Sequence, residues 1–154
     1  MKKMLFSAVA LAMLAVSSCK KDDDAKGPSN SITAAGQTYA ITSFNTSTGQ
    51  ATIVGGSGND ITTFTIRFGA NTAMPSEGNY NIVADADAAD EVEIQVGRVV
   101  NSTITGYESQ DGSPNLRVSM ENSKMKISFP NTTVKPRTGL GSENITISAN
   151  ATQL

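Results

Sequence analysis

Apolar and polar residues alternate with a period of two along most of the chain between residues 31 and 154. Phe64, Ile66 and Phe68, for example, alternate with Thr65 and Arg67. The same alternation recurs in four further segments, namely residues 91–96, 116–121, 124–129 and 144–148. This pattern is typical of half-buried antiparallel strands, in which one face packs on a core and the other meets solvent.

Clusters of turn-forming residues separate the alternating segments. They are Gly36-Gln37, Gly55–Asp60, Pro75–Gly78, Asp111–Pro114 and Gly139–Gly141. Many short strands with such punctuation predict an all-β domain, a single antiparallel β-sandwich of about eight to ten strands. A lipocalin-like closed barrel is the alternative, because strand patterns alone do not fix how a sheet closes.

One hairpin can be placed in register from the sequence. If Asn122-Ser123 is a two-residue loop, an opposite-charge pair lies next to the turn and the inner row is wholly apolar. The facing pairs are then Glu121 with Lys124, Met120 with Met125, Val118 with Ile127, and Leu116 with Phe129.

The aromatic residues divide into two groups. Four lie at inward positions of the expected strands and are predicted to pack in the core: Phe64, Phe68, Tyr80 and Phe129. Tyr39, Phe44 and Tyr107 are expected to be less constrained.

The first residues have the layout of a secretory signal peptide. Lys2 and Lys3 supply positive charge, and an apolar run from Met4 to Val16 follows, which is too short for a membrane-spanning helix. Small residues then lead to Cys19, the single cysteine of the chain. We therefore expect a signal peptide over residues 1–18, a lipidated N-terminus with a flexible tether over 19–30, and one domain over 31–154.

The segment Val16-Ser17-Ser18-Cys19 resembles the bacterial lipobox. The resemblance implies cleavage before Cys19 and lipidation of its thiol, and two or three acyl chains would hold the protein on a membrane permanently. Val16 and Ser18 are tolerated variants at positions where the pattern favours Leu and Gly or Ala. The alternative is an ordinary secretory signal with an incidental cysteine.

The five residues after Cys19 are Lys20, Lys21, Asp22, Asp23 and Asp24. They resemble the start of mature surface lipoproteins of the Bacteroidota, in which a lysine followed by acidic residues acts as an export signal to the cell exterior. The resemblance implies an outer-membrane lipoprotein that faces outward. A solvated spacer on a protein of the periplasmic leaflet is the alternative.

A second resemblance concerns the fold. Pro75–Val83 looks like the "P-x-x-G-x-Y-x-I" step of small all-β domains of unknown function in Bacteroidota lipoproteins. It implies a fold class and brings no activity with it.

Composition narrows the function classes. Without Lys2 and Lys3 the mature chain has 10 basic and 14 acidic residues, a formal charge of −4, so no basic footprint for nucleic acid exists. Histidine is absent, and lipidation would occupy the only thiol. Ser–His and Cys–His pairs are therefore impossible, and we expect neither an enzyme nor a cofactor.

One acidic constellation could carry chemistry. Asp85, Asp87, Asp90 and Glu91 place four carboxylates on one expected loop, and carboxylate oxygens are ligands for Ca²⁺. The spacing lacks the glycine and terminal glutamate of an EF-hand loop. An acidic surface loop without a metal is the simpler interpretation. Glu91 and Glu93, roughly 7 Å apart on one strand face, have a glycosidase-like separation, but no aromatic lining accompanies them, and a solvated outer face with Arg or Lys nearby is the preferred interpretation.

These observations predict a membrane partner through Cys19 and leave the domain's own partner, protein or glycan, unidentified. We expect a non-catalytic binding or assembly module on the outer membrane. The alternative is a carrier of a small ligand, which would require a cavity between the strands.

Overall fold

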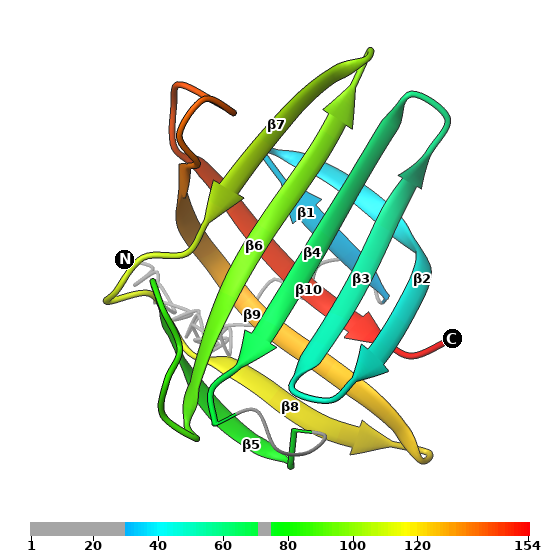
Figure 1. Cartoon of the computed structure of the whole chain (residues 1–154). Coiled ribbons are helices and arrows are strands. Elements are labelled where there is room, and N and C mark those ends of the chain that lie inside the picture. The colour runs from blue at the N-terminus through cyan, green and yellow to red at the C-terminus, as the bar shows by residue number, and fades with distance from the viewer. Residues whose placement is uncertain (1–29, 71–74) are drawn as a thin grey trace, which may run out of the picture.

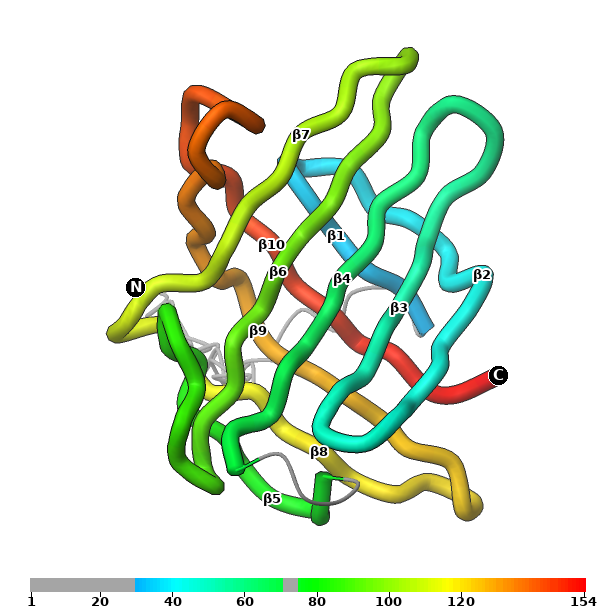
Figure 2. Tube along the Cα trace, viewed as in Figure 1, coloured from blue at the N-terminus to red at the C-terminus, as the bar shows by residue number. Residues whose placement is uncertain are grey.

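A computed structural model describes residues 30–70 and 75–154, in which ten strands form one mixed sheet folded into two facing layers (Figures 1 and 2). The predicted signal peptide, Cys19 and the Lys20–Asp24 run lie outside the described residues. The strands are β1 (Ser31–Ala34), β2 (Gln37–Ser47), β3 (Gln50–Ser57), β4 (Asp60–Phe68), β5 (Gly78–Val83), β6 (Glu91–Val100), β7 (Thr103–Glu108), β8 (Leu116–Glu121), β9 (Lys124–Pro136) and β10 (Ile145–Thr152).

The prediction of an all-β, sandwich-like fold is confirmed. In Figure 1 the front layer contains β3, β4, β6 and β7, and the back layer contains β1, β8, β9 and β10. Their hydrogen-bonded order is β10-β1-β2-β3-β4-β6-β5-β8-β9-β7, with additional β10–β9 and β6–β7 pairings. Neighbouring strands are antiparallel, except that β5 runs parallel to β6.

Three strands, β2, β5 and β9, pair within both layers and join them. The first half of β2 pairs with β1, and from Ile41 onward β2 pairs with β3. The register shifts between Ile41 and Ser43, where the strand turns from one layer to the other. Bends and bulges of this kind make the corners of sandwiches in which strands change sheets.

The β8–β9 hairpin has the predicted register. Asn122 and Ser123 have φ angles of 51° and 63°, as a two-residue type I′ turn requires, and Val118 lies opposite Ile127. Met120 is nevertheless 49% exposed, so the apolar inner row of this hairpin is not buried at every position. Met125, which lies directly opposite Met120, is only 3% exposed, so the exposure is confined to the β8 side of the hairpin.

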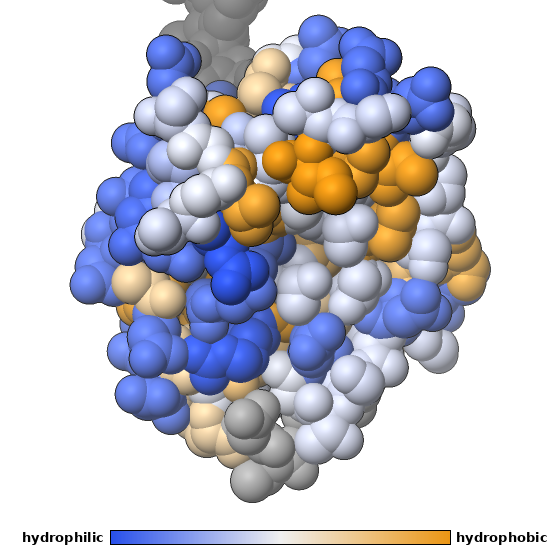
Figure 3. Space-filling model, turned by 45° about the horizontal axis from the view of Figure 1, so that its top comes forward, coloured by the Kyte–Doolittle hydropathy of each residue, from blue (hydrophilic) through white to orange (hydrophobic). Residues whose placement is uncertain are grey.

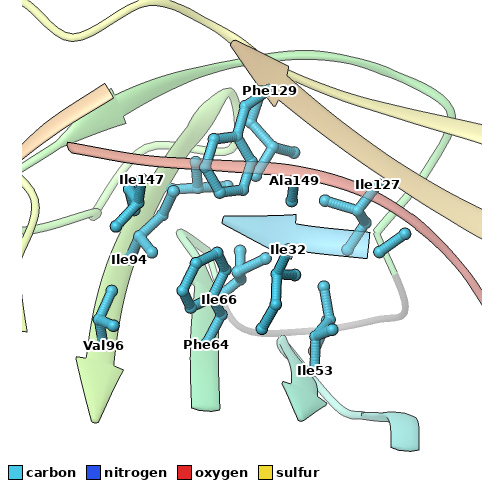
Figure 4. Close-up of a cluster of buried hydrophobic side chains, with 14 of the residues drawn as sticks. Ile32, Ile53, Phe64, Ile66, Ile94, Val96, Ile127, Phe129, Ile147 and Ala149 are labelled. Atoms are coloured by element: carbon cyan, nitrogen blue, oxygen red, sulfur yellow. The ribbon is translucent and has the colours of Figure 1, made fainter. Parts of the chain in front are cut away.

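Apolar side chains from both layers fill the interior (Figure 4). Phe64 on β4 and Phe129 on β9 face each other with ring centroids 6.0 Å apart. Tyr39, Phe44 and Tyr107 are also buried, which corrects the expectation that they are less constrained. The largest fully buried side chains are those of Ile32, Ile53, Phe64, Ile66, Ile82, Val92, Ile94, Val96, Leu116, Val118, Ile127 and Ile147.

The expected turn at Gly55–Asp60 is mostly strand. β3 continues to Ser57, and the turn is reduced to Gly58-Asn59. A Cβ atom at Gly55 would lie 2.9 Å from the side chains of Ile32 and Tyr39, so glycine lets β3 approach β1 and β2 closely. The glycines that resemble a turn in the sequence therefore mark a close contact inside the sandwich.

Asn30 enters the domain beside its C-terminal end. Its Oδ1 accepts a hydrogen bond of 2.9 Å from Thr152 N, and Gln153 N donates to Met125 O next to the β8–β9 turn. In the part of the chain that the structure describes, no helix has the length and apolar character needed to cross a membrane.

Candidate functional site

The loop that carries Asp85, Asp87, Asp90 and Glu91 is held by its own carboxylates. Glu91 Oε2 accepts hydrogen bonds from the backbone N–H groups of Ala88 and Asp87, at 3.0 and 3.1 Å. These two bonds, that of Ala88 first, lower the pKa of Glu91. Asp90 Oδ2 accepts a 3.2 Å bond from Asn81 Nδ2.

Arg67 fixes the start of this loop to the sheet. Its Nε donates to Glu93 Oε2 and its Nη1 to the carbonyl of Ala86, both at 2.8 Å, and its Nη2 pairs with Asp85. The hydrogen bond to Glu93, more than any other interaction, raises the pKa of Arg67. One guanidinium thus joins β4, β6 and the loop.

The four candidate carboxylates do not gather around one point. Within residues 30–70 and 75–154, no group of three or more acidic side chains has a geometry that could hold a metal ion. Asp85, Asp90 and Glu91 each contact a different partner. That the loop carries no calcium stays a prediction, and its charges serve the fold.

Glu93 departs from the solvated face that the sequence suggests. It is 8% exposed, and both of its carboxylate oxygens are bonded, Oε2 to Arg67 and Oε1 to Gln95 Nε2 at 2.7 Å. Glu91 and Glu93 therefore have separate structural partners.

On the outer face of the front layer, the cations are paired with carboxylates of the same face. Glu108 Oε1 lies 3.2 Å from Lys135 Nζ, and Glu108 Oε2 lies 3.9 Å from Arg137 Nε. Arg67 is paired with Glu93 and Asp85. The charges on this face are consequently committed to one another.

Apolar side chains lie on the same layer near the β6–β7 turn, and Figure 3 shows apolar groups gathered on the visible surface. Ile61, Val99 and Ile104 face one another in register on β4, β6 and β7. Ile104 is 66% exposed, and Leu140 on the β9–β10 loop is 39% exposed. This apolar row was not anticipated from the sequence, because its three members belong to strands that the pattern alone does not bring together.

A small polar cluster lies inside the same end of the sandwich. Arg98 Nη2 donates to Tyr39 Oη, which donates to Asp60 Oδ1, each at 3.0 Å. Arg98 Nε and the hydroxyl of Thr62, its cross-strand neighbour, are buried without a hydrogen-bond partner among the described residues. Arg98 continues the inward positions of Val92, Ile94 and Val96 along β6, so the period of two extends to this arginine.

The outer face of the back layer is polar and hollowed. We call it the polar face, and it consists of Asn79, Arg117, Ser119, Glu121, Lys124, Lys126, Ser128, Asn150 and Thr152 on β5, β8, β9 and β10. One hollow of about 330 Å³ lies over β9 and β10, and another of about 470 Å³ over β5 and β8.

The residues that line the two hollows are polar or charged, apart from Gly78 and Val118. The first is lined by Asn30, Glu121, Asn122, Lys124, Lys126, Asn150 and Thr152. The second is lined by Glu77, Gly78, Asn79, Arg117, Val118 and Ser119. The sequence pattern placed Arg117 and Lys126 outward, but it did not show that these strands lie side by side.

Comparison of the chain with protein-family models, with curated proteins and with solved structures finds no match.

Proposed function

We propose that this protein is a lipoprotein of the outer membrane, displayed on the cell surface, whose domain acts as a non-catalytic binding or assembly module. The lipobox-like segment before Cys19 and the charged run Lys20–Asp24 support the address. Residues 20–30 would serve as a tether with a typical end-to-end span of roughly 17–20 Å.

The filled interior is the main reason to prefer a module that binds at its surface over a carrier with an enclosed cavity. Phe64, Phe129 and their neighbours occupy the space between the layers (Figure 4), and the two hollows described above lie on the outer surface. A carrier holds its ligand in an enclosed, mostly apolar cavity. Binding on the outer faces fits this domain better.

Mass spectrometry of the full-length lipidated protein under native conditions tests the choice. The protein is purified from its own membrane in mild detergent, and small molecules that stay bound are released and identified. We expect no stoichiometric apolar compound apart from the acyl chains on Cys19. One such compound per chain would contradict the proposal and favour the carrier.

The export part of the proposal has its own test. Replacement of Lys20–Asp24 by alanines should preserve acylation and reduce the fraction of protein that protease removes from intact cells. If the variant and the parent are cleaved equally, the charged run is a spacer.

A further inference from the structure

We propose that the polar face binds an acidic polysaccharide, with Arg117 and Lys124 contacting its carboxylate or sulfate groups and neighbouring amides contacting its hydroxyls. This inference rests on the proposed function as a binding module and names the class of its partner.

Strand register makes the polar face continuous. Arg117 on β8 lies between Asn79 on β5 and Ser128 on β9, and Ser128 lies opposite Asn150 on β10. Neighbouring strands are about 4.8 Å apart, so this row of four side chains spans roughly 14 Å. That length accommodates several sugar units of an extended chain.

A second row runs beside the first and links the two hollows. Lys126 on β9 lies opposite Ser119 on β8 and opposite Thr152 on β10. Ser119 lines the larger hollow, whereas Lys126 and Thr152 line the smaller one. The hollows are therefore adjacent along a single surface.

The cations of this face are available to a ligand. Arg117 and Lys124 are exposed and form no ion pair with any residue that the structure describes, and only Lys126 is paired, with Glu121 at 3.1 Å. On the opposite face Arg67, Lys135 and Arg137 are all paired with carboxylates. The polar face and its two hollows carry three cations against two carboxylates, Glu77 and Glu121, and this net positive charge on one face of an acidic protein favours an anionic partner there.

Neutral polar residues outnumber charged ones four to three around the smaller hollow, and the larger hollow has two of each. Asn30, Asn122 and Asn150 line the smaller hollow, and Asn79 lines the larger one. A side-chain amide both donates and accepts hydrogen bonds, as recognition of sugar hydroxyls requires. The only large apolar residue of the two linings is Val118.

This composition favours a polysaccharide over the other anionic partners. Protein interfaces rely on buried aromatic and other large side chains at their centre, which this face lacks. Recognition of anionic lipid uses clusters of about four to eight basic residues, more than the three found here. An acidic glycan needs only a few cations among many amides and hydroxyls.

The test measures binding by the full-length lipidated protein in nanodiscs of neutral lipid. Polygalacturonate and dextran sulfate are the probes, dextran is the uncharged control, and polyglutamate and phosphatidylglycerol vesicles represent an acidic peptide and a membrane. We expect both acidic polysaccharides to bind, with affinity that falls as ionic strength rises. Dextran, polyglutamate and the vesicles should bind at least tenfold more weakly.

Matched variants localise the site. Arg117→Gln with Lys124→Gln should weaken polysaccharide binding by tenfold or more, whereas Lys135→Gln on the opposite face should change it less than twofold. Asn79→Ala with Asn150→Ala should also weaken it, with no change in the weak binding of polyglutamate. Unchanged melting temperatures verify that each variant is folded.

Several results would overturn the inference. They are failure of both acidic polysaccharides to bind at millimolar concentrations of repeating unit, equal binding of polyglutamate, binding of the vesicles alone, or an equal loss in Lys135→Gln. None of these results affects the mass-spectrometry test of the proposed function. The proposal of a binding module would then remain, with a partner other than an acidic polysaccharide.

Discussion

Arg67 on β4 lies directly opposite Glu93 on β6, and its Nε donates a 2.8 Å hydrogen bond to Glu93 Oε2. The side chain of Glu93 is 10% exposed, so its charge depends on this partner. The same guanidinium also holds the carbonyl of Ala86. The acidic loop that resembles a ligand site in the sequence is thus attached to the sheet by an arginine.

Arg67→Met should lower the free energy of unfolding by about 2 kcal/mol, because it leaves the buried Glu93 without its cation while part of Arg67 is solvent-exposed. Urea denaturation measures the change. Asp85→Asn is the matched control, since the Asp85 side chain is 78% exposed, and it should cost less than about 0.5 kcal/mol. Equal losses in the two variants would show that the Arg67–Glu93 pair is unimportant.

Glu91 should make stability depend on pH in acid. Its pKa in the folded state is lowered from 4.5, so its hydrogen bonds stabilise the domain fully above about pH 4.5. That stabilisation is lost as the pH falls from there through the lower pKa of the folded state. Glu91→Gln should therefore reduce the melting temperature at pH 7, and its difference from the parent should shrink as the pH falls below 4.5.

Glu143→Gln is the control for this experiment, because Glu143 is exposed and forms no hydrogen bond or ion pair with any described residue. It should melt with the parent at both pH values. The role of the Glu91 carboxylate would be contradicted if Glu91→Gln lowered the melting temperature by the same amount at pH 7 and at pH 3.

The loop of Asp85, Asp87, Asp90 and Glu91 should hold no calcium. Melting temperatures in EDTA and in millimolar Ca²⁺ are expected to agree, whereas a bound ion at a hundredfold excess over its Kd would add about 2.7 kcal/mol. A higher melting temperature in Ca²⁺ than in EDTA, lost in the Asp87→Asn variant, would show that this loop is a metal site.

Local patterns predicted the strands and the β8–β9 register, because a one-residue slip would expose every apolar side chain of the hairpin. Local patterns did not predict which strands pair when they are far apart in the sequence. The parallel contact of β5 with β6 and the approach of Gly55 to Ile32 depend on segments far apart in the chain.

The same limit explains the errors about individual side chains. Tyr39 was expected to be less constrained, yet it lies opposite Ile32 in the part of β2 that pairs with β1, and it is buried. The polar face likewise needs β5, β8, β9 and β10 together. Sequence reasoning finds only residues that are close together along the chain. It therefore selected the acidic loop as the candidate site and missed the polar face.

Ile127→Asp tests the buried face of the β8–β9 hairpin. Ile127 is fully buried opposite Val118, so an unpaired carboxylate there should cost several kcal/mol, comparable to the whole stability of a small domain. Ser128→Asp, one residue along and opposite Arg117 on the outer face, should change stability by less than about 0.5 kcal/mol. Thermal melting compares the two, and similar losses would refute the alternation of faces.

Metabolic labelling with an alkyne fatty acid, combined with protease treatment of intact cells, tests the central claim of a lipid-anchored protein displayed at the cell surface. The full-length protein should carry the label and be cleaved from outside the cell. Cys19→Ala should lose the label and remain unprocessed, since the thiol would be the site of acylation. Label retained by Cys19→Ala, or a labelled parent protein that external protease never reaches, would contradict the account.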